Sequence, residues 1–278
     1  RAPRQKRGFR SILAASILWS ALAGAADSQT PVTASPPARE LGRYDVVVIG
    51  AGPAGISAAV AAARMGAHTA LVERYGAVGG NLTLGNVNPI LGSVAPGTMY
   101  DELRALFLAG HDEVPVQTRN GREVHIDTEQ AKGQLVQWLA AAGVALFLQA
   151  TLCQTVLEGK RLRSVVVATP GDQGTLHGTC FVDATGDGTA AYLTGAECRV
   201  GRDGDGLTQP TTLEFTLSDV DESHAITCFG GSDKVALPDG KLYRDLCREA
   251  NARGDLPKNV TIGRLHKTFY PGERTVSA

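Results

Sequence analysis

Residues 44–73 read YDVVVIGAGPAGISAAVAAARMGAHTALVE, and this stretch decides the fold. The run 44–49 is β-branched and almost continuously apolar, which is typical of a strand buried on both faces of a parallel sheet. Residues 56–65 are rich in alanine and contain no Gly or Pro, so they predict a helix. Residues 68–72 predict a second strand, and Glu73 follows at its carboxyl end. Strand, glycine-rich turn, helix, strand and acid, in this order, predict a unit that binds an adenine dinucleotide.

The turn between the first strand and the helix consists of Gly50, Ala51, Gly52, Pro53, Ala54 and Gly55. Gly50 allows the tight turn, Gly52 lets the backbone approach a pyrophosphate, and Gly55 lets the helix pack close to the strand. The helix N-terminus offers N–H groups to the phosphates, and Glu73 can accept hydrogen bonds from ribose hydroxyls. We therefore assign the six turn residues and Glu73 to cofactor binding. Arg74 either contacts a phosphate or is solvated beyond the sheet edge.

Residues 72–82, VERYGAVGGNL, extend this pattern. The stretch 44–92 resembles the flavoproteins that have the glutathione-reductase type of FAD-binding domain. In that family, a glycine pair after the acidic residue lets a loop pass close to FAD. The resemblance implies that Gly79, Gly80 and Asn81 lie near the pyrophosphate and ribityl chain. The alternative for the pair is an ordinary flexible loop.

A second motif lies about a hundred residues further on, where residues 181–188 read FVDATGDG. It resembles the ATG-type motif of the same family, in which a late strand runs back beneath the cofactor. An apolar strand that ends in small residues and a carboxylate suits the carboxyl edge of an open α/β sheet, where ligands bind. We assign Gly186 and Asp187 to the cofactor. Asp187 or Thr189 is predicted to cap a helix at 189–193.

The sequence between the two motifs predicts the rest of an α/β domain. Asp127 and Thr128 precede an amphipathic helix over 129–142. A third parallel strand is predicted at 144–148, and three strands joined by short glycine turns form a meander at 152–158, 163–169 and 175–182. In the family, the backbone at the start of such a meander contacts adenine, which implies this role for Leu152 beside Thr151. Cys153 is interpreted as a small buried residue.

We therefore predict an α/β chain with a three-layer FAD/NAD(P)-binding, Rossmann-like domain at 42–198 that contains a β-meander crossover. An incomplete mixed α+β substrate domain is expected at 199–278, with a strand at 207–217 and a helix at 241–253. Gln209 is either a flavin or substrate contact or a strand cap. We predict no metal site, because 201–206 lacks the EF-hand register and the five cysteines form no CxxC. No catalytic residue can be assigned from spacing.

The N-terminus resembles an export signal. Basic residues at positions 1–10 precede an uncharged stretch at 11–26, which is too short to span a bilayer and ends in Ala23-Gly24-Ala25. We predict a signal peptide over 1–25, a Pro-rich linker over 26–41 and no membrane span in the mature chain. Export machinery is then a partner, through the Sec or the twin-arginine route, and the product is periplasmic or secreted.

Composition predicts a soluble globular chain. The chain has 278 residues, of which 43% are hydrophobic and 20% charged, with a net charge of −1. Removal of 1–25 deletes five basic residues and no acidic ones, which leaves 22 basic and 28 acidic residues and a net charge of −6. This balance argues against nucleic-acid binding. Because members of the family extend further, we expect the chain to be a fragment.

The resemblance implies an FAD-dependent oxidoreductase that transfers a hydride between an unknown small-molecule substrate and flavin. Two alternatives share the scaffold, namely a dinucleotide-binding module without redox activity and an enzyme resembling the thiazole-synthesising proteins. The pair Gly79-Gly80 and the run Thr185-Gly186-Asp187 favour flavin.

Overall fold

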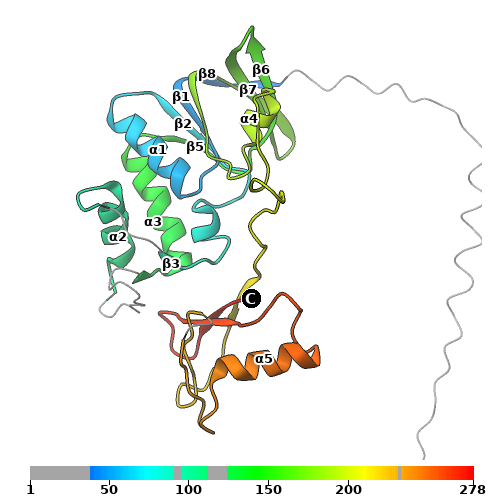
Figure 1. The fold of residues 1–278 in the computed structure, drawn as a ribbon. Coiled ribbons are helices and arrows are strands. Elements are labelled where there is room, and N and C mark those ends of the chain that lie inside the picture. The colour runs from blue at the N-terminus through cyan, green and yellow to red at the C-terminus, as the bar shows by residue number, and fades with distance from the viewer. Residues whose placement is uncertain (1–37, 91–94, 112–123, 231–232) are drawn as a thin grey trace, which may run out of the picture. The chain divides into compact units, whose positions relative to one another are not determined.

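A computed structural model describes residues 38–90, 95–111, 124–230 and 233–278 (Figure 1). Residues 38–278 form one compact unit. The predicted signal peptide (1–25) and all but the last four residues of the predicted linker (26–41) lie outside the described residues. Within the described ranges, no helix combines the length and the apolar character that crossing a membrane requires.

The main sheet has six strands in the order β5-β2-β1-β8-β7-β6. Four strands run parallel, namely β1 (Arg39–Ile49), β2 (Thr69–Val72), β5 (Ala145–Phe147) and β8 (Asp172–Asp183). The strands β6 (Thr151–Glu158) and β7 (Arg161–Thr169) extend the sheet in antiparallel fashion and form the predicted meander. This topology confirms the predicted α/β, Rossmann-like fold.

Helices α1 (Pro53–Arg64) and α3 (Thr128–Ala141) pack together on one face of the sheet, and α2 (Met99–Leu108) packs against α3 (Figure 1). Val48 lies with these helices in one buried cluster, whereas its neighbours Val47 and Ile49 lie in a second cluster on the opposite face. This alternation follows from the pleat of the strand. Each such buried aliphatic side chain contributes about 1.5–3 kcal/mol.

The first strand is longer than the sequence predicts. β1 begins at Arg39, so Arg39, Glu40 and Leu41 of the predicted linker belong to the sheet, where the register shifts between Glu40 and Gly42. The correction has a tertiary cause. These residues lack the continuous apolar pattern of 44–49 and are ordered by parallel pairing with β8 from Gly174 onward.

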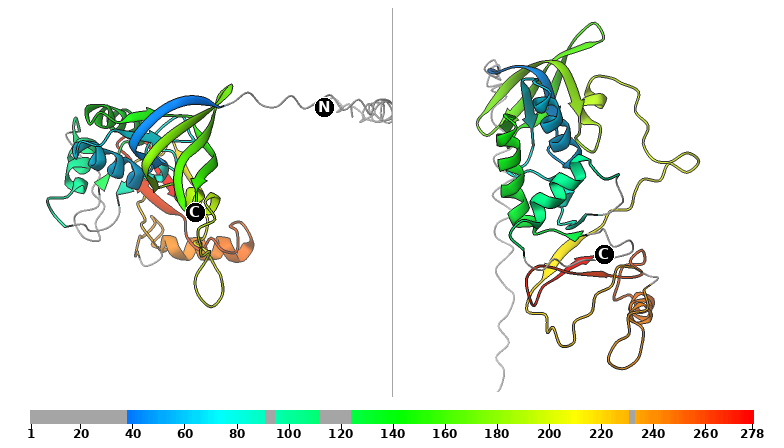
Figure 2. Two further views of the ribbon diagram at one scale, coloured as in Figure 1. Left: turned by 90° about the horizontal axis from the view of Figure 1, so that it is seen from above. Right: turned by 90° about the vertical axis from the view of Figure 1, so that its left-hand side faces the viewer.

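A second, three-stranded antiparallel sheet has the order β10-β11-β9, with β9 (Glu214–Leu217), β10 (Arg264–Lys267) and β11 (Arg274–Ser277). Helix α5 (Tyr243–Arg253) lies beside it (Figures 1 and 2), and the Tyr243 hydroxyl donates to the carbonyl of Gly263. The predicted strand at 207–217 is thus confined to its last four residues. The short strands β3 (Pro89–Ile90) and β4 (Val124–His125) pair with each other in an antiparallel, two-stranded ribbon.

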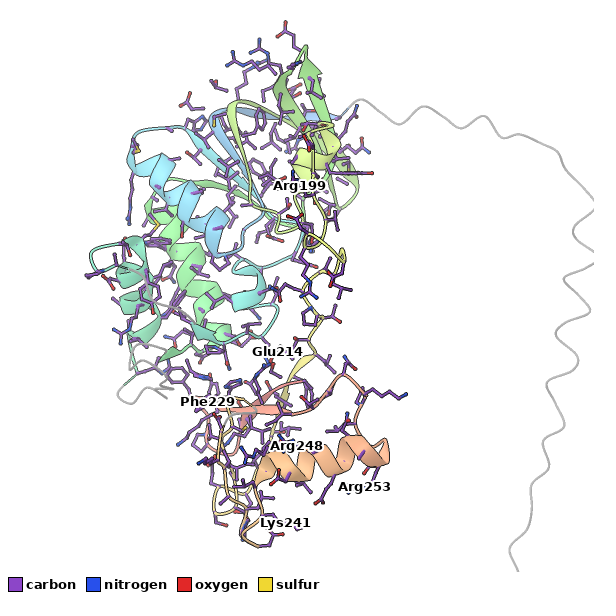
Figure 3. All side chains as sticks on the ribbon, viewed as in Figure 1. Arg199, Glu214, Phe229, Lys241, Arg248 and Arg253 are labelled. Carbon is purple, nitrogen blue, oxygen red and sulfur yellow. The ribbon has the colours of Figure 1, made fainter. Side chains whose placement is uncertain are left out.

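The connection between the two sheets contains no helix or strand from Thr194 to Leu213, and the predicted domain boundary at 198 falls within it. Figure 3 labels Arg199 near the start of this connection and Glu214 at its end. Hydrogen bonds from the loop before β3 still reach the second sheet. The Asn86 amide donates to the Thr216 hydroxyl and the Asn88 amide donates to the Thr275 hydroxyl, at 3.2 Å and 2.8 Å.

Candidate cofactor site

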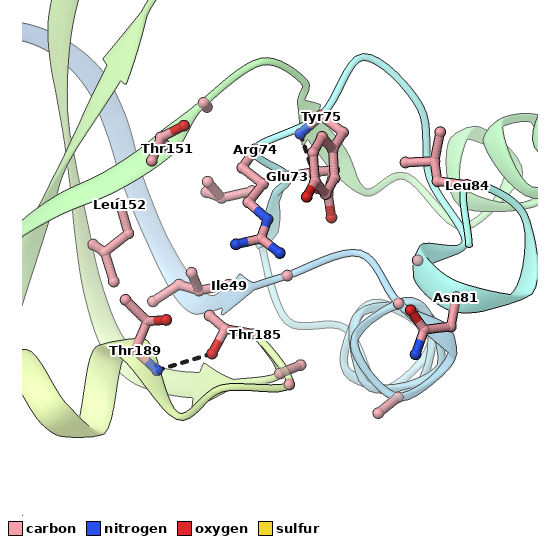
Figure 4. Close-up of a pocket in the computed structure, with 18 of the residues that line it drawn as sticks. Ile49, Glu73, Arg74, Tyr75, Asn81, Leu84, Thr151, Leu152, Thr185 and Thr189 are labelled. Atoms are coloured by element: carbon pink, nitrogen blue, oxygen red, sulfur yellow. Dashed lines mark hydrogen bonds between the residues drawn. The ribbon is translucent and has the colours of Figure 1, made fainter. Parts of the chain in front are cut away.

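A candidate ligand site lies at the carboxyl ends of β1, β2 and β8, where open α/β sheets bind ligands. A pocket of about 650 Å³ opens there (Figure 4), a volume typical of small-molecule and cofactor sites. Its walls come from the glycine turn after β1, the segments that follow β2 and β8, the 80–85 loop and the start of β6. Five segments of the chain therefore meet at one sheet edge.

The glycine turn fits tightly against its neighbours at two positions. Gly50 has a φ of +96°, and a Cβ there would lie 2.4 Å from the carbonyl oxygen of Ala184. A Cβ at Gly55 would lie 1.8 Å from the carbonyl oxygen of Gly50. These contacts exclude any larger residue, since real Cβ atoms do not approach so closely. Glycine at both positions therefore allows α1 to begin close to the end of β1.

Gly52 differs from both, because a Cβ at this position would meet no atom of the described residues within 4 Å apart from its own chain neighbours. Gly52 is the N-cap of α1, Pro53 occupies the first turn, and no acidic side chain lies there. The backbone N–H groups of a first helical turn lack partners within the helix. The space beside Gly52 therefore suits an anionic group that approaches the backbone.

The glycine pair of the next loop lies against this turn. The N–H of Gly79 donates to the carbonyl of Ala51 at 2.7 Å, and a Cβ on Gly80 would lie 3.0 Å from the Cα of Gly52. Both glycines have positive φ, at +108° and +54°. Gly80 thus lines the pocket, and Gly79 fastens the loop to the glycine turn. The short 3₁₀ helix η1 (Gly80–Leu82) carries Asn81 into the pocket wall.

Glu73 holds two loops together at the end of β2. Its side chain is buried, with Oε2 accepting from the N–H of Ala51 at 2.7 Å and Oε1 accepting from the N–H of Tyr75 at 2.9 Å. Hydrogen bonds to a carboxylate are stronger than those between neutral groups. The acid predicted to contact ribose thus also orders the glycine turn beside the predicted pyrophosphate position.

Arg74 extends across the pocket beside Glu73 (Figure 4). Its guanidinium lies 4.8 Å from the centroid of the Tyr75 ring, and Nη1 lies 3.9 Å from Oδ2 of Asp187. Both side chains of this ion pair are more than half exposed, so the pair contributes little to stability. Arg74 is therefore free to exchange Asp187 for an anionic ligand.

The turn after β8 is ordered by Asp183. Its Oδ1 accepts from the N–H and the hydroxyl of Thr185, and its Oδ2 accepts from the N–H of Ala191 at 2.9 Å. Partial burial raises the pKa of Asp183, but these hydrogen bonds outweigh it and leave the pKa below its usual value. The Thr185 hydroxyl then accepts from the N–H of Thr189 (Figure 4).

This network corrects the predicted cap of α4 (Thr189–Leu193). The N-cap residue is Gly188, with a φ of +67° and no side-chain cap, and neither Asp187 nor Thr189 fills that role. Thr185 and Asp183 reach the first-turn N–H groups instead, because the turn folds their side chains back over the start of the helix. Cys153, predicted to be buried, is exposed, because it lies on β6, an edge strand of the main sheet whose residues are mostly exposed.

Most of the sequence-predicted cofactor residues line the pocket. These ten are Gly50, Gly52, Pro53, Ala54, Glu73, Arg74, Gly80, Asn81, Leu152 and Gly186. The other four are Ala51, Gly55, Gly79 and Asp187, and they shape the wall from behind or pair with Arg74. Gln209 is exposed on the connection and is not part of this wall.

Sequence reasoning missed several lining residues, among them Tyr75, Leu84, Gly85 and Thr189. Tyr75 and Gly85 lie within a few residues of assigned positions, and extending each motif by one turn would have included them. Leu84 and Thr189 lie within three residues of the assigned Asn81 and Asp187, so the same extension would have included them. In the described ranges, no cluster of three or more His, Cys, Asp or Glu side chains is arranged to hold a metal ion.

The pocket suits FAD in three respects. The open space beside Gly52 accepts a pyrophosphate, Glu73 lies where a ribose would follow, and Thr151 with Leu152 offers a wall for adenine. The fold and this site define a flavin-type dinucleotide-binding protein. Residues 45–275 match the family described as FAD dependent oxidoreductase, and the chain belongs to that family. This confirms the resemblance, the enzyme class and FAD as the cofactor.

Curated relatives match only part of the chain. The tRNA uridine 5-carboxymethylaminomethyl modification enzyme MnmG of Aquifex aeolicus is 40% identical over 96 residues, 32% of this chain and 15% of the relative. The protein of the same name from Rhodopirellula baltica is 51% identical over 63 residues, 23% of this chain and 9% of the relative. The chain thus corresponds to less than a sixth of the length of these two relatives.

A solved structure supports the fold. A geranylgeranyl bacteriochlorophyll reductase-like protein from Thermoplasma acidophilum superposes with a TM-score of 0.53 at 14% sequence identity. The superposition covers 84% of this chain and 56% of that one. The similarity therefore extends beyond the first sheet, and at this identity it concerns the fold alone.

Proposed function

We propose that this chain is the cofactor-binding portion of an enzyme that transfers a hydride between a small organic substrate and flavin. The observation that carries the proposal is the open space beside Gly52, in a pocket that the start of α1 and Glu73 both line. Apart from its own chain neighbours, no side chain of the described residues approaches within 4 Å of a Cβ placed at Gly52, and a dinucleotide has the phosphate and ribose groups that match this pocket.

Each part of the pocket has a role in holding the cofactor. The first turn of α1 would receive the pyrophosphate, and Glu73 would accept hydrogen bonds from the ribose hydroxyls while it keeps the turn closed through Ala51. Gly80 and Asn81 would lie along the ribityl chain. Arg74 would neutralise phosphate charge after release from Asp187. When bound, FAD supplies the hydride chemistry, and the chain supplies position and electrostatics.

Absorbance spectroscopy tests this proposal directly. Purified protein that has been incubated with FAD and freed of excess ligand should retain the flavin absorbance bands in about one equivalent per chain. NAD incubated in parallel should not be retained. Retention of NAD without FAD would overturn the proposal in favour of an enzyme resembling the thiazole-synthesising proteins. Retained FAD that no reductant can reduce would favour a module without redox activity.

We propose a small molecule, rather than a nucleic acid, as the substrate. The MnmG relatives are named for modifying tRNA, but their similarity spans a third of this chain or less. A mature chain with a net charge of −6 also lacks the excess of basic residues that a phosphate backbone attracts. A mobility-shift titration with bulk tRNA at low salt should give no complex, and a complex stable at 150 mM salt would contradict this assignment.

We also propose that the chain is exported. Support comes from the sequence of residues 1–25, with its basic start, apolar centre and small-x-small end. Fusion of residues 1–40 to alkaline phosphatase, which becomes active only after export, should give activity in a bacterial host. An inactive fusion would contradict the proposed export. Activity that persists in a strain without the twin-arginine pathway would assign the Sec route.

A further inference from the structure

A second pocket of about 440 Å³ lies next to the cofactor pocket, and Leu84 lines both. Its walls come from the 83–88 loop, the start of α3, β9 and the segment between β10 and β11. Hydroxyl, amide and carboxylate side chains line it, together with the aromatic residues Phe269 and Tyr270. The pocket therefore offers hydrogen bonds beside the place where FAD is proposed to bind.

The clearest indication of a ligand in this pocket is the unpaired side-chain oxygen of Asn88. Its side chain is 3% exposed, and its Nδ2 donates to the Thr275 hydroxyl at 2.8 Å. Its Oδ1 is buried and accepts no hydrogen bond from any described residue. A buried acceptor left without a donor is energetically unfavourable. Because Asn88 lines the pocket, a ligand that brings a donor would recover this energy.

The charged side chains of the lining also favour a ligand that donates hydrogen bonds. Three carboxylates line the pocket, from Asp127, Glu129 and Glu273, against one ammonium, from Lys132. That ammonium lies 2.6 Å from Oε1 of Glu129 and is thereby neutralised. The remaining two carboxylates leave the site negative, which attracts cations and repels acids.

The hydrogen-bond partners of these two acids differ. Asp127 caps α3 by accepting from the N–H groups of Glu129 and Gln130, and it also accepts from the Tyr270 hydroxyl. The hydrogen bond to Asp127 raises the pKa of Tyr270 to about 12, so the phenol stays neutral and adds no further charge. Glu273 receives only the Thr268 hydroxyl, at 3.3 Å, among its described side-chain hydrogen bonds. Glu273 thus keeps acceptor capacity for a ligand.

We propose that this pocket binds a small, positively charged amine that also carries hydroxyl groups, and that this class includes the substrate. Asn88 Oδ1 and Glu273 accept hydrogen bonds from the ligand, and the negative lining excludes carboxylates. That the bound amine is the substrate rests on the proposed flavin function, since Leu84 places the two pockets side by side. The binding step itself depends only on the second pocket.

Three two-carbon probes of matched size test the proposal, namely ethanolamine, ethylene glycol and glycolate. The ¹⁵N-labelled full chain is titrated with each probe at constant ionic strength and without FAD, and the side-chain amide of Asn88 is followed by NMR. The variant Asn88→Ser assigns that signal. We expect ethanolamine to bind at least tenfold more tightly than glycolate, with ethylene glycol between them. Equal or tighter binding of glycolate, or no shift with ethanolamine up to 0.5 M, would overturn the proposal.

A matched pair of substitutions tests the role of charge. Glu273→Gln keeps size and removes the negative charge, and it should weaken ethanolamine binding at least threefold while leaving ethylene glycol unchanged. Glu249→Gln, an exposed residue of α5 beside Lys241, makes the same change away from the pocket and should have no effect. If Glu273→Gln binds ethanolamine as tightly as the wild type, the preference for ethanolamine over glycolate does not come from Glu273, and the proposed site is contradicted.

The flavin proposal is measured separately in the same samples. FAD retention is read by absorbance, whereas amine binding is read by NMR without FAD. If the protein binds ethanolamine but does not retain FAD, the flavin function is excluded and the amine site stands. The opposite outcome would keep the flavin enzyme and exclude this substrate class.

Discussion

The carboxylate of Glu73 accepts a hydrogen bond from the backbone N–H of Ala51, with 2.7 Å between Oε2 and the nitrogen. The two residues are 22 positions apart, and the bond ties the end of β2 to the glycine turn after β1. The same side chain also receives the N–H of Tyr75. Glu73 therefore shapes the pocket through its partners as well as facing it.

This relationship predicts a double effect of Glu73→Gln. The amide has one acceptor oxygen and an NH₂ group that faces a backbone donor, so we expect a loss of about 1–3 kcal/mol in unfolding free energy. FAD affinity should fall at least tenfold. Urea denaturation and FAD titration measure the two effects. Glu158→Gln, an exposed acid paired with Arg163, is the control and should change neither. Full FAD affinity in Glu73→Gln would contradict the proposed ribose contact.

Two glycines of the same turn should respond in opposite ways to valine. Gly52→Val places its methyl groups in open space, so we expect a folded protein with a modest loss from the poorer N-cap, and at least tenfold weaker FAD binding. Gly55→Val drives Cβ into the Gly50 carbonyl and should unfold the domain or lower its stability by more than 3 kcal/mol. Thermal unfolding and flavin absorbance separate the two variants. Wild-type FAD affinity in Gly52→Val would refute our placement of the pyrophosphate.

Asp183→Asn should loosen the turn after β8. Asparagine keeps one acceptor oxygen but loses the charge that accepts from Thr185 and Ala191, so we expect a loss of about 1–2 kcal/mol in stability. FAD affinity should decrease severalfold, because this turn forms one wall of the pocket. Asp172→Asn, at the other end of the same strand, is the matched control. Equal stability of the two variants in urea denaturation would remove the structural role of Asp183.

His125 should make the protein sensitive to acid. Its ring is fully buried, its two nitrogens have no hydrogen-bond partner among the described residues, and its centroid lies 5.6 Å from that of His266. Burial, followed by the charge of His266, lowers the pKa of His125 to about 3. In the folded protein His125 therefore stays neutral at pH values at which the unfolded chain binds a proton, namely below about pH 6.5. Stability from this group is complete above that pH and is lost as the pH falls toward 3.

At pH 5 the expected loss from His125 is about 2 kcal/mol, at about 1.4 kcal/mol for each pH unit. His125→Leu should flatten the decline of unfolding free energy between pH 7 and pH 5. The decline should not vanish, because burial also lowers the pKa of His266. His224→Asn, an exposed histidine beside Asp221, serves as the comparison and should retain the wild-type slope. A slope in His125→Leu equal to that of the wild type would show that His125 is accessible to protons.

The strand, turn and helix at 44–64 could be predicted because their signals are local. Apolar runs, alanine-rich stretches and glycines at fixed spacing act over a few residues, and ten of the fourteen assigned residues line the pocket. The start of β1 at Arg39 could not be predicted, since its charged residues become strand only through pairing with β8. The cap of α4 was missed for a related reason, because the turn directs Thr185 and Asp183 over the helix end.

By itself, the sequence determined the sheet type, the glycine turn and the acid that define a dinucleotide site, because neighbouring residues along the chain create these features. Tertiary structure alone decided where the second pocket lies and what charge it carries. Asn88 and Thr275 are 187 positions apart, and Tyr270 reaches Asp127 across 143. No periodicity or motif links residues at such separations. Their contact exists only after the loop before β3, the start of α3 and the second sheet have packed together, and that packing leaves the Asn88 acceptor without a donor.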